Sequence, residues 1–176
     1  FGVWNICKKK EGSSIYFRLS TKKLMQPERK LSEKDKQDII KGCYWLHKPE
    51  TSKSIILICT GVMIGEVEKL KEEITKDEID IGILIATSPD KLYSEWIKAK
   101  DNNTTSHIEE TLSLYNKNTA LITIIDGHSS SLAWIGSVLG HKVYPLGLSK
   151  FGQSGDLDEI YSYTNIDFKS IIDRIA

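Results

Sequence analysis

Residues 119–148 carry the clearest pattern of apolar and polar positions in the chain. Ala120–Ile125 is an apolar run rich in β-branched residues, which is typical of a strand buried on both faces. A turn at Asp126-Gly127, three serines and apolar residues at helical spacing follow, and Gly140 ends the helix. Lys142–Leu146 then forms a second short strand. This order of strand, turn, helix and strand is a βαβ unit, which predicts a parallel sheet.

The same alternation begins at residue 43 and continues to the end of the chain. Strands are predicted at 43–47, 54–59, 79–86, 120–126 and 142–146. Helices are predicted at 62–76, from Pro89 through Ile97, at 106–116, from Ser129 to Leu139, at 156–163 and at 167–175. Ser88 can cap the second of these helices, and Pro89 fits its first position. The pattern therefore predicts an α/β three-layer α/β/α sandwich with a five-stranded, mostly parallel sheet.

The residues before position 41 lack this pattern and differ in composition from the rest of the chain. Ile15–Leu19 alternates like a strand, and Thr21–Lys41 has the charged composition of a linker, with a helical turn near Glu33–Ile40. We therefore expect a boundary that separates residues 1–40 from a domain at 41–176. Because the chain begins with Phe rather than Met, we also expect a C-terminal piece of a longer protein.

Composition narrows the function classes. The 24 Lys and Arg residues balance the 24 Asp and Glu residues, so the sequence gives no reason to expect nucleic acid as a partner. The apolar runs are far shorter than a membrane span, which argues against a membrane partner. Cys7, Cys43 and Cys59 are odd in number and widely spaced, which indicates reduced thiols and a cytoplasmic location.

Candidate site residues lie where the predicted strands end. In parallel sheets, ligands and partners meet the carboxyl ends of strands where the winding reverses. A glycine-rich loop, FGQSGD, follows the last strand and adds a second candidate contact. Together these stretches give a candidate crevice or interface made of Gly61, Ser88, Asp126, Gly127, His128, Phe151, Gly152 and Gln153.

No motif among these residues matches a known catalytic pattern. Gly61 and Gly65 lack the spacing of a dinucleotide-binding loop and the lysine of a phosphate-binding loop. Gly127-His128-Ser129-Ser130-Ser131 misses the last glycine of a nucleophile elbow, and no carboxylate lies between Ser129 and His141. No Cys or His pair has the spacing of metal ligands. The residues themselves thus predict a domain that packs, binds or assembles.

Several segments in order resemble the transketolase superfamily of thiamine-diphosphate enzymes. They are IYFRLST, GCYWLHKPE, SIILICTGVMIGEV, ILIATSPDKLYSEW and TIIDGHSSSLAWIGSVLGHKVYPLGLSKFGQSGDLDEIYSYTNID. They resemble the end of its pyrimidine-binding domain and its C-terminal domain, most closely in the homodimeric type of pyruvate dehydrogenase. Residues 1–40 would then be the tail of the pyrimidine-binding domain and the linker.

The resemblance implies a fold and a parent enzyme. The first strand would run antiparallel, and the strand order would be first, third, second, fourth, fifth. The parent would be a homodimer that decarboxylates pyruvate and passes the acetyl group to the lipoyl arm of an acyltransferase core. Thiamine diphosphate and magnesium would bind domains absent from this chain, so the fragment itself would hold neither and would be inactive.

One departure from the family bears on the substrate. Transketolases typically have a phosphate-binding arginine after Leu-Ser at the end of the pyrimidine domain, whereas Leu19-Ser20 here precedes Thr21. That difference favours a 2-oxo acid over a sugar phosphate. Two alternatives stay open, namely the C-terminal domain of a transketolase and a free-standing module that binds a small ligand near Gly61 and His128.

Overall fold

A computed structural model describes residues 30–51, 54–74 and 80–175, together with 7, 8, 10–12, 14, 16 and 23. The strands are β1 (Cys43–His47), β2 (Ile55–Cys59), β3 (Ile81–Ala86), β4 (Ala120–Ile124) and β5 (Val143–Leu146). The helices are α2 (Glu33–Lys41), the 3₁₀ turn η1 (Gly61–Met63), α3 (Ile64–Ile74), α4 (Pro89–Asp101), α5 (His107–Leu112), α6 (Ser130–Ala133), α7 (Gly136–Leu139), α8 (Leu157–Tyr163) and α9 (Phe168–Ile175).

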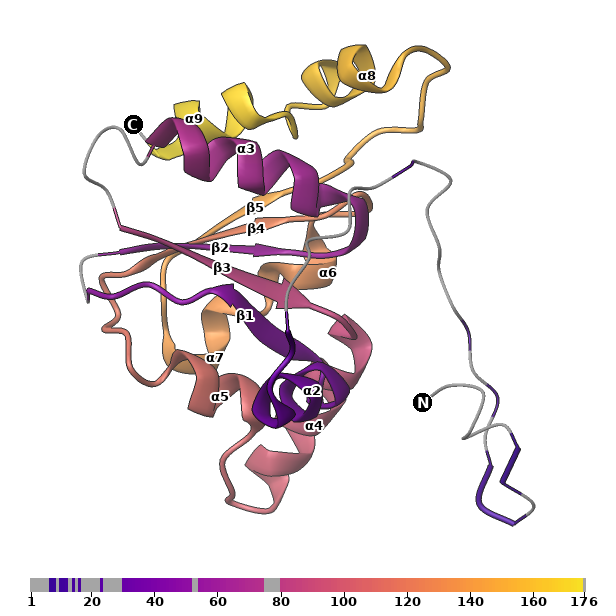
Figure 1. Ribbon diagram of the computed structural model, residues 1–176, viewed down its shortest axis with the longest axis vertical. Helices are drawn as coiled ribbons and strands as arrows, with labels where there is room; N and C mark the ends of the chain where they lie inside the picture. Colours follow the sequence, from indigo (N-terminus) through magenta and orange to yellow (C-terminus); the bar gives the residue numbers. More distant parts are fainter. Residues whose placement is uncertain are drawn as a thin grey trace.

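The five strands form one sheet in the order β1-β3-β2-β4-β5 (Figure 1). β1 pairs with β3 antiparallel, and all other pairs are parallel. The predicted α/β sandwich, its strand order and the antiparallel first strand are therefore confirmed. The order reverses at β2, because the chain continues to β3 on one side of it and returns to β4 on the other.

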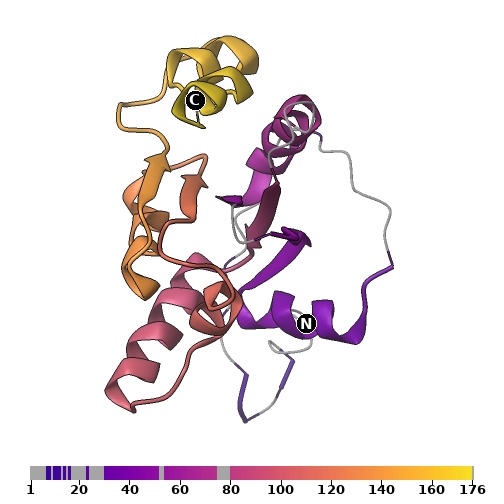
Figure 2. The same ribbon diagram turned by 90° about the vertical axis from the view of Figure 1, so that its left-hand side faces the viewer.

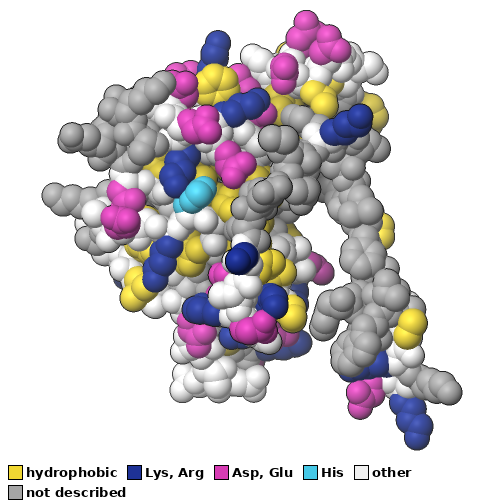
Figure 3. All heavy atoms as spheres, viewed as in Figure 1, with side chains coloured by type: hydrophobic (Ala, Val, Ile, Leu, Met, Phe, Trp, Pro, Cys, Tyr) yellow, Lys and Arg dark blue, Asp and Glu magenta, His cyan; other side chains and the backbone are white. Residues whose placement is uncertain are grey.

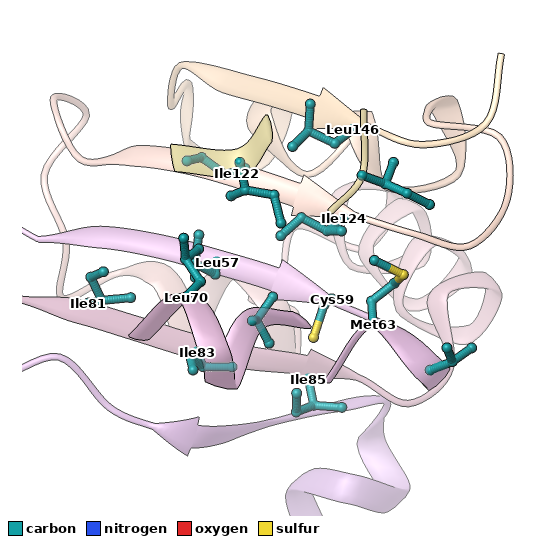
Figure 4. Close-up of a cluster of buried hydrophobic side chains, with 14 of the residues drawn as sticks. Leu57, Cys59, Met63, Leu70, Ile81, Ile83, Ile85, Ile122, Ile124 and Leu146 are labelled. Atoms are coloured by element: carbon teal, nitrogen blue, oxygen red, sulfur yellow. The ribbon is translucent and has the colours of Figure 1, made fainter. Parts of the chain in front are cut away.

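Helices cover both faces of the sheet, as Figures 1 and 2 show. The α3 face is covered by α3, α8 and α9, and the α4 face by α4, α5, α6 and α7. Side chains alternate between the faces, so Leu57 and Cys59 of β2 lie in one core while Ile56 and Ile58 lie in the other. Figure 4 shows the first of these cores, with side chains from four strands directed toward α3. Each fully buried aliphatic side chain contributes about 2 kcal/mol through its removal from water.

Several predicted boundaries differ from the structure. The predicted helix from Ser129 to Leu139 is two short helices, α6 and α7, because bonds such as that from the Ile135 N–H to the Leu132 carbonyl (3.1 Å) have the tighter 3₁₀ spacing. Close packing accompanies this break, since a Cβ at Gly136 would lie 2.8 Å from Val143 Cγ1. Ser88 occupies the cap position of α4, but its side chain accepts no capping hydrogen bond.

The other differences are at the ends of elements. β4 ends at Ile124 rather than at residue 126, and α5 spans 107–112 rather than 106–116. Three predicted stretches extend beyond the described residues. They are the end of the predicted helix 62–76, the first residue of the predicted strand 79–86, and most of the predicted strand Ile15–Leu19.

α2 is longer than the predicted helical turn and is fastened to the sheet. It begins with a capping box between Ser32 and Asp35 and ends at Gly42, whose φ of +115° few other residues adopt. The Thr87 hydroxyl donates to the Ile39 carbonyl at 2.8 Å. The division at residues 40 and 41 stays a prediction, although α2 bonds directly to the loop after β3.

Candidate functional site

Three of the predicted site stretches lie at one edge of the sheet. Cys59, the last residue of β2, lies beside Ile85 of β3 and Ile124 of β4. The residues that follow these strands therefore emerge together, at what we call the carboxyl edge. Gly61 and Asp126–His128 flank the point where the strand order reverses, as expected for a switch point.

Gly61 shapes the turn that leaves β2. Its φ is +58°, a conformation that strains residues with a Cβ, and an added Cβ would meet no atom within 4 Å. The glycine is exposed and starts the 3₁₀ turn that leads into α3. It is thus required for the backbone path and not for close packing.

His128 is held by its own turn. The Ser130 N–H donates to its Nδ1 at 3.3 Å, and the Ser130 hydroxyl lies 2.7 Å from the same atom. Since Nδ1 accepts from a backbone N–H, the proton of the neutral ring resides on Nε2. The imidazole is exposed, and its bonds to Ser130 support the start of α6.

Gly147 closes the same corner. The Leu148 N–H donates to the Gly127 carbonyl at 2.7 Å, and a Cβ at Gly147 would lie 2.6 Å from that carbonyl oxygen and 2.8 Å from the Ser129 nitrogen. The loops after β4 and β5 are therefore packed backbone against backbone. This close approach fixes the position of His128.

Asp126 belongs to a group of acidic and phenolic side chains that the sequence pattern did not reveal. Burial, with a smaller contribution from the charges of Asp126 and Glu66, raises the pKa of Tyr161, on α8, to about 12. Tyr161 and Glu66 are each 4% exposed, and Glu66 pairs with Lys69 at 3.2 Å. The group joins the end of β4 to α3 and α8, three elements far apart in sequence, so local periodicity could not have found it.

The remaining predicted residues do not join the corner formed by Gly127, His128 and Gly147. Ser88 follows β3 at the same edge, but it is half-buried and its N–H donates to the Gly42 carbonyl at 3.1 Å, so it is tied to the start of β1. Phe151, Gly152 and Gln153 are exposed in the loop between β5 and α8, and Phe151 is 95% exposed. A small cavity of about 60 Å³ lies beside that loop, lined in part by Lys150 and Tyr163.

The two buried thiols are unreactive at neutral pH. Burial raises the pKa of Cys43 to about 12 and also raises that of Cys59, so both stay protonated at neutral pH. Both are free cysteines, as predicted. Among the described residues, no group of three or more His, Cys, Asp or Glu side chains could hold a metal ion. No helix in the described ranges is long and apolar enough to cross a bilayer.

A family model described as the transketolase-like TK C-terminal domain matches residues 42–167. The chain belongs to this family. The match begins one residue before β1 and ends just before α9, so it spans the whole sheet. No curated protein sequence matches the chain.

Solved structures of transketolases share the fold of this transketolase C-terminal domain. The enzyme from Campylobacter jejuni is 18% identical, with a TM-score of 0.55 over 78% of this chain and 19% of that chain. Transketolase from Leishmania mexicana is 9% identical, with a TM-score of 0.56 over 78% of this chain and 18% of that one. A split-gene transketolase, described as an inactive tetramer of four beta subunits, is 11% identical, with a TM-score of 0.53 over 74% of this chain and 40% of that chain. The chain thus spans about a fifth of the length of the first two enzymes, and at these identities the likeness shows the fold alone.

Proposed function

We propose that this chain is the C-terminal assembly domain of a larger thiamine-diphosphate enzyme, and that the reaction takes place in other domains of that parent. The observation that carries the proposal is the family match over residues 42–167, together with the strand order β1-β3-β2-β4-β5. A chain that covers 19% of a transketolase chain leaves most of such an enzyme to other segments.

The proposal assigns the cofactor to other domains of the parent. Among the described residues of this chain, no group of three or more His, Cys, Asp or Glu side chains could hold a metal ion. Thiamine diphosphate and magnesium would bind those other domains. Within the parent, this domain contributes contacts rather than a reacting group.

The loop that carries Phe151 is our proposed contact with a second copy of the parent. The residues from Ser149 to Glu159 are all exposed, and a phenyl ring that is 95% exposed gains stability when a partner covers it. The split-gene transketolase that shares this fold is itself a tetramer. Two copies of the parent would thus form a homodimer that depends in part on this loop.

A pair of surface substitutions tests that contact. In the full-length parent, Phe151→Asp should weaken self-association about tenfold or more, because it places a charge in the covered surface. Leu114→Asp is the matched control, since Leu114 is 66% exposed and lies after α5 instead. Equal association constants for the two variants, measured by analytical ultracentrifugation, would exclude the loop from the interface.

Two reactions of the parent each have one observation in favour. Thr21 stands where transketolases have an arginine for the sugar phosphate, which favours pyruvate decarboxylation and acetyl transfer to a lipoyl acyltransferase core. The solved structures with this fold named above are transketolases, which favours two-carbon transfer between sugar phosphates at least as strongly. Turnover of pyruvate against xylulose 5-phosphate by the full-length parent distinguishes the two.

Calorimetry of the isolated chain tests whether the cofactor binds this domain or other domains of the parent. The 176-residue chain, titrated with thiamine diphosphate and magnesium, should show no tight binding that depends on magnesium. The full-length parent should bind the cofactor tightly under the same conditions. Tight, magnesium-dependent binding by the isolated chain would contradict the proposal.

A further inference from the structure

A cavity of about 530 Å³ opens between α4, α5 and the C-terminal end of α2. Leu92, Ala99 and Ile108 belong to its lining, and each is at least nine-tenths buried. Sites for small organic molecules typically enclose about 300–1,000 Å³. The other lining residues of this cavity are polar or charged, so it offers a few apolar side chains among many hydrogen-bonding groups. None of the residues at the carboxyl edge lines this cavity, so we treat it as a separate site and call it the α4–α5 groove.

The rim of the α4–α5 groove carries more positive than negative side chains. Lys41, Lys91 and Lys98 line it together with Glu95 and Glu110. Lys98 is paired with Glu95 at 3.2 Å, which leaves Lys41 and Lys91 against Glu110. Lys34 on α2 lies near Glu110 but is itself paired with Asp38, so Glu110 keeps most of its charge. Figure 3 shows Lys, Asp and Glu side chains intermixed over α2, beside this groove.

Two of the rim side chains are held in place by the fold. The Lys91 ammonium donates to the Ile40 carbonyl at 2.7 Å and keeps two further N–H groups. His107 Nε2 lies 2.9 Å from the Cys43 carbonyl, so it donates there and leaves Nδ1 as an acceptor on the neutral ring. Positioned polar groups beside a few apolar side chains can orient a small ligand.

The loop at the end of the groove is also preorganised. The Thr104 N–H donates to the Ala99 carbonyl at 2.8 Å, and the Asn102 side-chain amide donates to the Lys98 carbonyl at 2.8 Å. These bonds fasten the loop from α4 to α5 before any ligand arrives. Binding would therefore cost little ordering of the backbone.

We propose that the α4–α5 groove binds a small organic anion, whose apolar part lies over Leu92, Ala99 and Ile108 and whose charged group meets Lys91 and Lys41. Lys41 is exposed and Lys91 is half-buried, so water and salt screen the attraction. The affinity is therefore weak to moderate and falls with added salt. The proposal does not depend on the reaction of the parent enzyme.

Phenyl phosphate combines a ring with a charged group and is the probe for this site. Added to the ¹⁵N-labelled 176-residue chain, it should shift the amide resonances of residues 102–108 and of Lys41 in a saturable way. Inorganic phosphate lacks the ring and benzyl alcohol lacks the charge, so each should bind more weakly. Shifts centred on residues 60, 61 and 126–128 instead, or no saturable shift, would overturn the proposal.

A charge-removing variant assigns the contact to the groove. Lys91→Gln keeps a donor for the Ile40 carbonyl but loses about 1 kcal/mol of attraction, which corresponds to about fivefold weaker binding of phenyl phosphate. Lys100→Gln is the control, because Lys100 lies on the same helix over the Trp96 ring and does not line the groove. The amide spectrum of each variant reports whether it is folded. Equal affinity of both variants would contradict the assignment.

Discussion

The two faces of the sheet bury polar groups in different ways. On the α3 face, Glu66 and Asp126 lie close enough to Tyr161 for their charges to raise its pKa, and Lys69 pairs with Glu66. On the α4 face, the buried groups are neutral: Thr123 Oγ1 and Trp96 Nε1 have no hydrogen-bond partner among the described residues. The comparison shows that the buried carboxylate Glu66 has a partner of opposite charge, whereas single neutral polar groups are buried without one. The free-energy cost of burying an unpaired neutral group is smaller than that of burying an unpaired charge.

The first test asks whether the two faces contribute equally to stability. Leu70 on α3 and Leu112 on α5 are both completely buried. Replacement of either by alanine should lower the free energy of unfolding by about 2–5 kcal/mol, because each leaves a cavity. Urea denaturation of the two variants measures both values. A small effect of Leu70→Ala alone would show that the α3 face is a loosely attached cover.

The second test addresses the charged group of the α3 face through pH. The folded state keeps Tyr161 neutral up to a pKa of about 12, whereas an unfolded chain ionises it near 10. Stability from this side chain is therefore present below pH 10 and is lost as the pH rises to 12. The loss is at most about 3 kcal/mol.

Tyr161→Phe isolates that contribution. Burial also raises the pKa of Cys43 to about 12, so this thiol adds a pH dependence of its own, and the informative quantity is the difference between wild type and variant. The variant should lose less stability than wild type between pH 10 and 12 in urea titrations. Parallel pH profiles would mean that the hydroxyl is not held in a buried, acidic environment.

The smallest effect should come from the neutral group of the α4 face. Thr123 is fully buried in the middle of β4, and its hydroxyl has no partner among the described residues. Thr123→Val keeps the shape and removes the cost of burying that hydroxyl, so we expect stabilisation by about 1 kcal/mol. The midpoint of thermal unfolding should rise. A lower midpoint would show that the hydroxyl is bonded in solution.

The sheet could largely be predicted from the sequence, because its signal is local. Runs such as Ile55–Cys59 and Ile81–Ala86 show their burial in their composition alone. Strand order and the antiparallel β1 are contacts between distant segments, and they followed only from the family resemblance. The break between α6 and α7 depends on how closely Gly136 approaches β5, which no local pattern records.

The candidate site could be predicted only in part. Gly61, Asp126 and His128 could be placed at one edge of the sheet because the ends of parallel strands meet there, whereas their role as a site stays a prediction. Glu66 and Tyr161 were missed, since a carboxylate in the first turn of α3 and a tyrosine on α8 look like ordinary helix residues. The α4–α5 groove was missed for the same reason, because its lysines come from two helices that only the fold brings together.

The subunit association of the full-length parent, with and without residues 42–176, tests the assembly role most directly. We predict a dimer for the intact enzyme, and for the shortened one a monomer that has lost turnover, as determined by analytical ultracentrifugation with activity measured on the same samples. A shortened enzyme that remains a dimer and keeps full turnover would contradict the account.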